Sequence, residues 1–152
     1  VRDIGLVNAT VTGGAYVGAL AGFARGGTTF TNVHASGSVT AITHSHSSGL
    51  VTALNMAGNA GGLVGQISST SVLDNVFSTA AVRGNENLGG LVGVSSGAIS
   101  NAYAMGSVTG VASGGQAAQN IGALVGGQSG GSITSSYATG YLTGANDIGG
   151  LV

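Results

Sequence analysis

Two histidines of this chain have the type and spacing of metal ligands. His44 and His46 are two residues apart, as on one face of a strand, and two imidazoles could form half of a metal site. The chain has no cysteine, and the segment 41–58 around the histidines holds no acidic residue to complete the site. We therefore interpret them as solvated loop side chains, and we predict no metal and no cofactor.

Carboxylate and serine chemistry are the other two possibilities. The four acidic residues are Asp3, Asp74, Glu86 and Asp147. Glycoside cleavage needs clustered carboxylates, but Glu86 and Asp147 fall two repeats apart. The strings 93–97 and 127–131 match Gly-x-Ser-x-Gly, yet no strand–turn–helix setting with a histidine and an acid is predicted around them. We predict no catalytic residue and no enzyme.

Threonines at equivalent repeat positions form a further candidate site. They are Thr12, Thr40, Thr109 and Thr143, with Arg83 at the same position of the third repeat. A flat array of such residues on a sheet could order water, as an ice-binding face does, but outward strand positions favour threonine in any case. The segment 41–58, with His44 and His46, is another candidate for a binding face, because insertions on one face of a repeat protein often bind ligands. A neutral decoration is an equally open interpretation, since loops also tolerate drift.

The charge content excludes two classes of partner. Charged residues make up 5% of the 152 residues, and the cations are three arginines without any lysine. No basic patch can form from so few cations, so we expect neither nucleic-acid binding nor attachment to anionic lipid. No apolar run approaches the roughly 18 residues of a membrane-spanning helix, so we expect no membrane insertion.

An internal repeat must position all of these residues. The phrase apolar-Gly-small-Leu-apolar-Gly recurs at 17–22, 60–65, 88–93, 121–126 and, cut short, at 148–152. A second phrase alternates with it, and its central apolar residues are Val11, Val39, Val82, Val108 and Leu142. One unit is about 27 residues long, with insertions at 41–58 and 111–119 that leave the same corner.

The repeat predicts an all-β fold, a parallel β-solenoid of about five coils. Each unit has three short apolar runs, punctuated by glycine, which we interpret as three short strands per coil, and none has sustained helical spacing. A unit this short buries its apolar face only by stacking on its neighbours, about 4.8 Å away. The usual crossover makes it right-handed. The expected coils of this single domain, 1–152, are 1–27, 28–69, 70–97, 98–131 and 132–152.

Stacking predicts columns of equivalent side chains. The first is large and mostly aromatic, and it holds Leu6, His34, Phe77, Tyr103 and Tyr137. The second holds Asn32, Asn75 and Asn101, which would form an amide ladder in which each side chain bonds the coil above and below.

The two phrases together resemble a known repeat. Gly89-Gly90-Leu91-Val92-Gly93 alternating with residues 101–110, Asn-Ala-Tyr-Ala-Met-Gly-Ser-Val-Thr-Gly, is similar to the GLUG-motif repeats of large secreted bacterial proteins, which include filamentous-haemagglutinin-like adhesins. The resemblance covers essentially the whole chain. It implies an extracellular or surface-attached bacterial β-helix used as a stalk or adhesive rod, and it carries over no catalytic residue.

The expected function is therefore that of a structural rod or filament-forming segment. Because the chain starts and stops inside a repeat, we expect it to be part of a longer protein. Its open strand edges predict end-to-end self-association, or continuation of the solenoid in the parent chain. The alternative is a binding module for a glycan, a host protein or ice, which would use the insertion corner or the threonine face.

Overall fold

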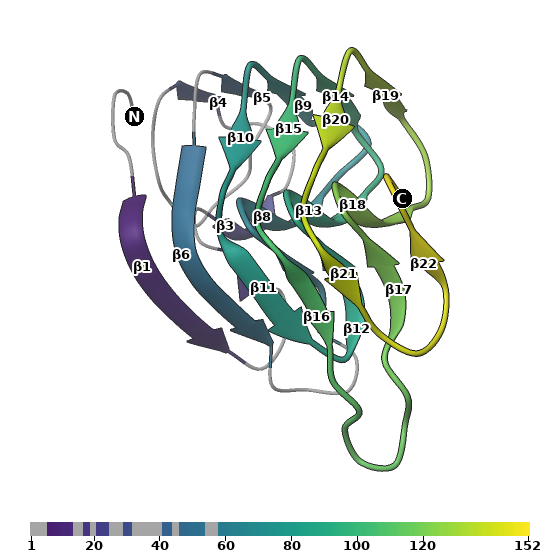
Figure 1. Ribbon diagram of the computed structural model, residues 1–152. Coiled ribbons are helices and arrows are strands. Elements are labelled where there is room, and N and C mark those ends of the chain that lie inside the picture. The colour runs from purple at the N-terminus through teal and green to yellow at the C-terminus, as the bar shows by residue number, and fades with distance from the viewer. Residues whose placement is uncertain are drawn as a thin grey trace.

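The computed structural model describes residues 6–13, 17–18, 21–24, 29–31, 41–43, 46–53 and 58–152, and it describes side-chain surroundings in the last two of these ranges. Every element in these ranges is a strand, and every strand pairs in parallel with its neighbours. The predicted all-β parallel solenoid is confirmed (Figure 1). The described part holds no helix that could span a membrane.

Four sheets run along the stack. Sheet A contains β1 (Leu6–Gly13), β6 (His46–Ala53), β10 (Phe77–Ser78), β11 (Ala81–Gly84), β15 (Tyr103–Ala104), β16 (Val108–Gly110), β20 (Tyr137–Ala138) and β21 (Leu142–Thr143). Sheet B contains β2 (Val17–Gly18), β7 (Ala60–Gly61), β12 (Glu86–Gly89), β17 (Gln119–Gly122) and β22 (Ile148–Gly149).

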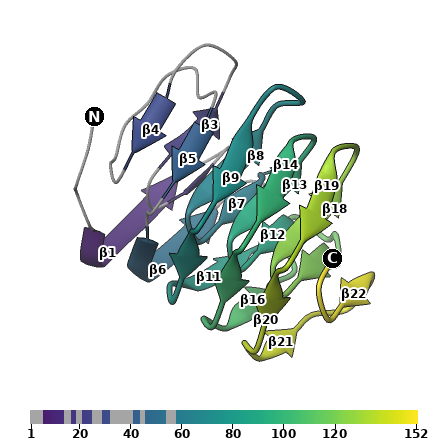
Figure 2. The same cartoon turned by 90° about the horizontal axis from the view of Figure 1, so that it is seen from above.

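The other two sheets complete each turn. Sheet C contains β3 (Ala21–Ala24), β8 (Val64–Ile67), β13 (Val92–Ser95) and β18 (Val125–Gln128). Sheet D contains β4 (Thr29–Thr31), β5 (Ala41–Thr43), β9 (Val72–Asp74), β14 (Ala98–Ser100) and β19 (Ser132–Thr134). We call one passage of the chain through these sheets a row. Figure 2 shows the rows side by side, in sequence order.

The number of rows is close to expectation. Sheet B has five strands, and the continuous part from β7 to β22 makes three full turns. The expectation of three strands in each coil is wrong, because the described residues form four sheets and each complete row passes through all of them. The apolar phrase 88–93 is not one strand but a corner, where β12 ends at Gly89 and β13 begins at Val92.

Glycine is required at this corner by close packing. A Cβ built on Gly89 would overlap the carbonyl oxygen of Val92 and lie 2.7 Å from the backbone nitrogen of Gly126 in the next row. Gly61 and Gly122 hold the same place in neighbouring rows, with the same kind of overlap. The recurring Gly therefore marks a sharp turn pressed against the next coil.

The second row differs from the expected register. Val51, rather than Val39, pairs with Val11 and Val82 in sheet A. Phe30 pairs with Ile42, and Ile42 pairs with Leu73, so β4 and β5 are neighbouring strands of sheet D. Segment 41–58 is therefore not an insertion, because it supplies β5 and β6.

A local sequence match explains this error. Gly37-Ser38-Val39-Thr40 repeats Gly106-Ser107-Val108-Thr109 more closely than the segment around Val51 does. The long-range pairing instead selects Val51, which is completely buried. Asn32, His34, Val39 and Thr40 lie outside the described residues.

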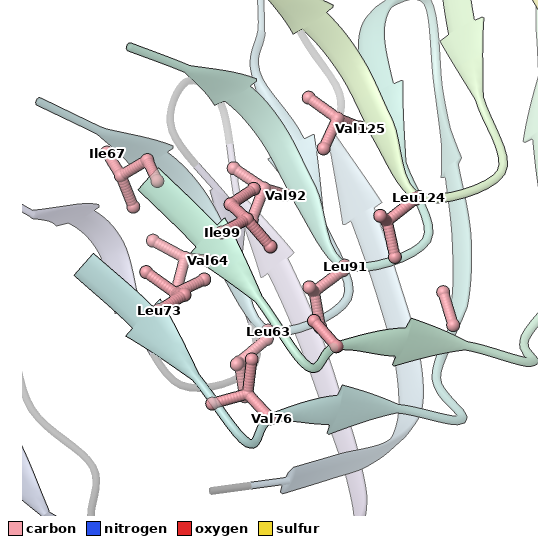
Figure 3. Packing of buried hydrophobic residues seen from close by; sticks show 12 residues of the cluster. Leu63, Val64, Ile67, Leu73, Val76, Leu91, Val92, Ile99, Leu124 and Val125 are labelled. Atoms are coloured by element: carbon pink, nitrogen blue, oxygen red, sulfur yellow. The ribbon is translucent and has the colours of Figure 1, made fainter. Parts of the chain in front are cut away.

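The core consists of columns of aliphatic side chains (Figure 3). Leu63, Leu91 and Leu124 are completely buried in three successive rows. Leu73 and Ile99 form a second column in sheet D, continued by the partly buried Ile133. Full burial of such a side chain contributes about 1.5–3 kcal/mol, so the stack supplies the apolar burial that a single coil lacks.

An aromatic column follows the outside of sheet A. His46, Phe77, Tyr103 and Tyr137 stack in order, with ring centroids 4.8, 4.8 and 5.2 Å apart and interplanar angles of at most 8°. His46 holds the place expected of His34. Leu6 pairs with Ser47, so it does not continue the column in register.

Asparagines in the left-handed conformation form the corners. One column, between sheets D and A, contains Asn75, Asn101 and Ser135. The other, at the start of the sheet B strands, contains Asn87, Asn120 and Asp147. All six residues have φ between 47° and 55°. Asparagine tolerates this conformation better than most residues. Between Asn75 and Asn101, the described members of the expected amide ladder, the amide–amide bond is absent, because the Asn101 amide donates to the Asp74 carboxylate (2.8 Å).

The amide ladder lies instead in the second column. Asn87 Nδ2 donates to Asn59 Oδ1 (2.8 Å), and Asn120 Nδ2 donates to Asn87 Oδ1 (2.9 Å). The signal that sequence reasoning missed is an Asn or Asp directly before the apolar phrase, at positions 59, 87, 120 and 147. The ladder ties three rows together through side chains.

Two substitutions of Asn87 separate the effect of its positive φ from that of its amide hydrogen bonds. Asn87→Gly keeps the positive φ but loses both amide hydrogen bonds, so we expect it to lower the free energy of unfolding by about 2 kcal/mol. Asn87→Ala should cost about 1 kcal/mol more, because alanine resists the left-handed conformation. Urea unfolding followed by circular dichroism measures both. A glycine variant as stable as the parent would show that the ladder contributes nothing.

Candidate binding face

The threonine positions form one column on the outer face of sheet A. Thr12 pairs with Thr52, Thr52 with Arg83, Arg83 with Thr109, and Thr109 with Thr143. The structure thus brings Thr12, Thr109 and Thr143 together. It places Thr52 in the second row, where Thr40 was expected. The triplet Leu50-Val51-Thr52 was the signal that sequence reasoning passed over.

The neighbouring outward column has no regular series of threonines, although Thr10 pairs with Leu50 at its start. It contains Leu50, Ala81, Ser107 and Tyr141. Leu50 is 40% exposed and Tyr141 is 87% exposed. Among the described side chains, these residues and Arg83 interrupt a regular Thr-x-Thr lattice.

Arg83 is the cation of this face. Its side chain is exposed, between the half-buried Thr52 and Thr109. Within the described part of the chain, no carboxylate forms an ion pair with its guanidinium. Because its side chain is exposed, its charge can reach a ligand.

A projecting loop lies beside Arg83, at the corner between sheets A and B. Residues 111–118 connect β16 to β17 and extend beyond the sheets (Figure 1); we call this loop the finger. At its tip, Ser113 and Gln116 exchange backbone hydrogen bonds of 3.0 and 2.9 Å, and Gly114 and Gly115 supply the positive φ of the turn. The expected insertion 111–119 corresponds to this finger.

Asn85 holds the finger to the row before it. Its side chain is 3% exposed, and Nδ2 donates to the carbonyl oxygens of Val111 (3.0 Å) and Gln116 (3.2 Å). The backbone nitrogen of Gln119 donates to Asn85 O (3.0 Å). Asn85 therefore fixes both ends of the finger, through its side chain at Val111 and through its backbone oxygen at Gln119. Sequence reasoning did not single out Asn85, because only the fold brings it to the finger.

A pocket of about 150 Å³ lies between the finger and sheet A. Its walls are Thr52, Ala53, Arg83, Gly84, Asn85, Val111, Ala112 and Ser113. The pocket combines one guanidinium, two hydroxyls and a buried amide with small apolar surfaces. These groups can offer hydrogen bonds and a positive charge to a ligand.

The remaining candidate residues lie apart from this pocket. His46 belongs to the aromatic column, and His44 lies outside the described residues. Glu86 and Asp147 belong to rows separated by β17. Asp74 accepts hydrogen bonds from Ser100 and Asn101, and Asp3 is not among the described residues. The described residues contain no group of three side chains suited to a metal.

Comparison with known proteins gives one match. Residues 117–143 match the family model described as "Glug: The GLUG motif". No curated protein and no solved structure matches the chain. The matched residues run from the end of the finger through β17, β18, β19 and β20 to β21, which is one full turn through the four sheets. The chain is therefore a β-solenoid that carries the GLUG motif at residues 117–143, within a region of repeats of that pattern.

Proposed function

We propose that this chain is a rod-forming structural segment of a bacterial cell-surface or secreted adhesin-like protein. The support is the architecture itself. Hydrogen bonds, aliphatic columns, stacked rings and an amide ladder all run along one axis, from row to row. Such a stack can be lengthened by adding rows without changing its cross-section, which suits a spacer better than a catalyst.

The apolar face of the last row is the observation that carries the proposal. Ile148, Leu151 and Val152 are 46%, 38% and 44% exposed. Their counterparts one row earlier, Ile121, Leu124 and Val125, are at most 1% exposed. The following row covers those counterparts, so the face of the last row fits a further coil of the same kind.

Tyr137 supports the same conclusion. Its ring is 54% exposed, whereas the equivalent Tyr103 is half-buried between two stacked rings. A further coil with an aromatic residue at this position would extend the column. In a solution of this chain alone, that coil must come from a second molecule, so end-to-end association is expected.

Charging the open face tests this proposal. Leu151→Lys places an ammonium group on the surface that a further coil would bury, and an unpaired buried charge is strongly unfavourable. We expect the parent chain to form elongated oligomers in sedimentation and electron microscopy, and Leu151→Lys to remain monomeric. Since Leu151 is already partly exposed, the monomer itself should stay folded.

Tyr141→Lys is the matched control. Tyr141 belongs to the same last row but points outward from sheet A, where it is 87% exposed. We expect this variant to associate like the parent chain. A parent chain that stays monomeric at every accessible concentration, or a Leu151→Lys variant that still forms rods, would contradict end-to-end stacking.

A further inference from the structure

The pocket beneath the finger suggests a function beyond that of a rod. We propose that it binds the carboxylate-bearing sugar of an acidic saccharide, such as a uronic or sialic acid unit. Three features of the pocket favour this ligand: its charge, its hydrogen-bonding groups and its shape. None of them depends on whether the chain forms rods.

The charge comes from Arg83. The residues on either side of it in the column, Thr52 and Thr109, are neutral, so the cation is specific to this row and to the pocket. Its planar guanidinium can donate two parallel hydrogen bonds to one carboxylate, and that geometry is stronger and more specific than a single contact. With no described acid paired to it, Arg83 is free to receive a ligand carboxylate.

The hydrogen-bonding groups favour a ligand rich in hydroxyls. Asn85 is 3% exposed, and its Nδ2 donates both of its hydrogen bonds to the finger. Its Oδ1 accepts no hydrogen bond from any described residue. A buried acceptor without a donor is costly, and a sugar hydroxyl can supply the donor. The hydroxyls of Thr52 and Ser113 line the same pocket.

The shape favours a single sugar ring. A volume of about 150 Å³ is below the roughly 300 Å³ at which drug-sized ligand pockets begin. Ala53, Val111 and Ala112 provide small apolar walls that the C–H face of a sugar can contact. Because Asn85 holds both ends of the finger, the outer wall is fixed before binding, which reduces the entropy lost when a ligand is ordered.

Nuclear magnetic resonance titration of the 152-residue chain tests this proposal. The probes are glucuronic acid and N-acetylneuraminic acid, with glucose as the uncharged sugar and acetate as the carboxylate without a ring. We expect saturable amide shifts at Thr52, Arg83 and Ala112 with at least one acidic sugar, and much weaker binding of glucose and acetate. The acid that binds more tightly shows whether the pocket prefers a uronic or a sialic acid.

Arg83→Thr is the decisive variant. It installs the residue found in the rows on either side, so the fold should be retained, and circular dichroism checks this. We expect it to weaken binding of the acidic sugar at least about tenfold, since a charged hydrogen-bonded pair is lost. Thr143→Ala changes the same column two rows away, outside the pocket, and should leave the affinity unchanged.

Three results would overturn the proposal. The first is the absence of saturable shifts with both acidic sugars. The second is an Arg83→Thr variant that binds as tightly as the parent chain. The third is acetate binding as tightly as the acidic sugars, which would make the pocket a simple anion site rather than a saccharide site.

Discussion

Replacing Gly89 by alanine is expected to lower the free energy of unfolding by about 3 kcal/mol or more. The new Cβ would overlap the carbonyl oxygen of Val92 and press on the backbone of Gly126 in the next row. Both obstacles are main-chain atoms held in a stacked corner, so neither can rotate away as a side chain could. Urea unfolding followed by circular dichroism gives the loss of stability.

Gly127→Ala is the control for this substitution. Gly127 lies on β18, and a Cβ there would meet only Asn87 Oδ1 at 3.5 Å and a methyl group of Val94 at 3.8 Å. These are ordinary contacts, so we expect a change within about 0.5 kcal/mol. Equal losses at Gly89 and Gly127 would mean that general strand propensity, rather than the corner, accounts for glycine in the phrase.

Replacing Leu91 by alanine is expected to cost about 2–5 kcal/mol. Leu91 is completely buried between Leu63 and Leu124 of the neighbouring rows, so its removal leaves a cavity inside the stack. The backbone around it is held on both sides by parallel ladders, which limits collapse into that cavity. Calorimetric or urea unfolding provides the measurement.

Leu151→Ala is the matched substitution in the last row. Leu151 has the same place in the phrase but is 38% exposed. In dilute solution we expect a loss well below that of Leu91→Ala, because less area is buried and the site opens to solvent. A loss at Leu151 as large as that at Leu91 would mean that the last row is already covered, and this would place a second molecule on it.

The fold class could be predicted from the sequence because the signal repeats. Five copies of one phrase impose the same local structure many times, and stacking is the only way to bury their aliphatic residues. The continuous columns of Leu63, Leu91 and Leu124 follow directly from that pattern. The threonines at 109 and 143 come together for the same reason, since equivalent residues of neighbouring rows must pair.

The register of the second row could not be predicted in this way. Residues 37–40 match the repeat more closely than those around Val51, and a local comparison prefers the closer match. Pairing in a parallel sheet is chosen by all the contacts of a strand with both neighbours. Those contacts place Val51 between Val11 and Val82, and they bring His46 into the aromatic column.

The sequence by itself thus determined the solenoid, its repeat length and its apolar columns, because those depend on a pattern repeated in every coil. Only the tertiary structure decided the features that depend on contacts between particular rows. The corner at Gly89, the anchoring of the finger by Asn85 and the pocket beside Arg83 each arise where residues from different rows meet. Such meetings depend on register and on loop path, and neither is encoded by the period of the repeat.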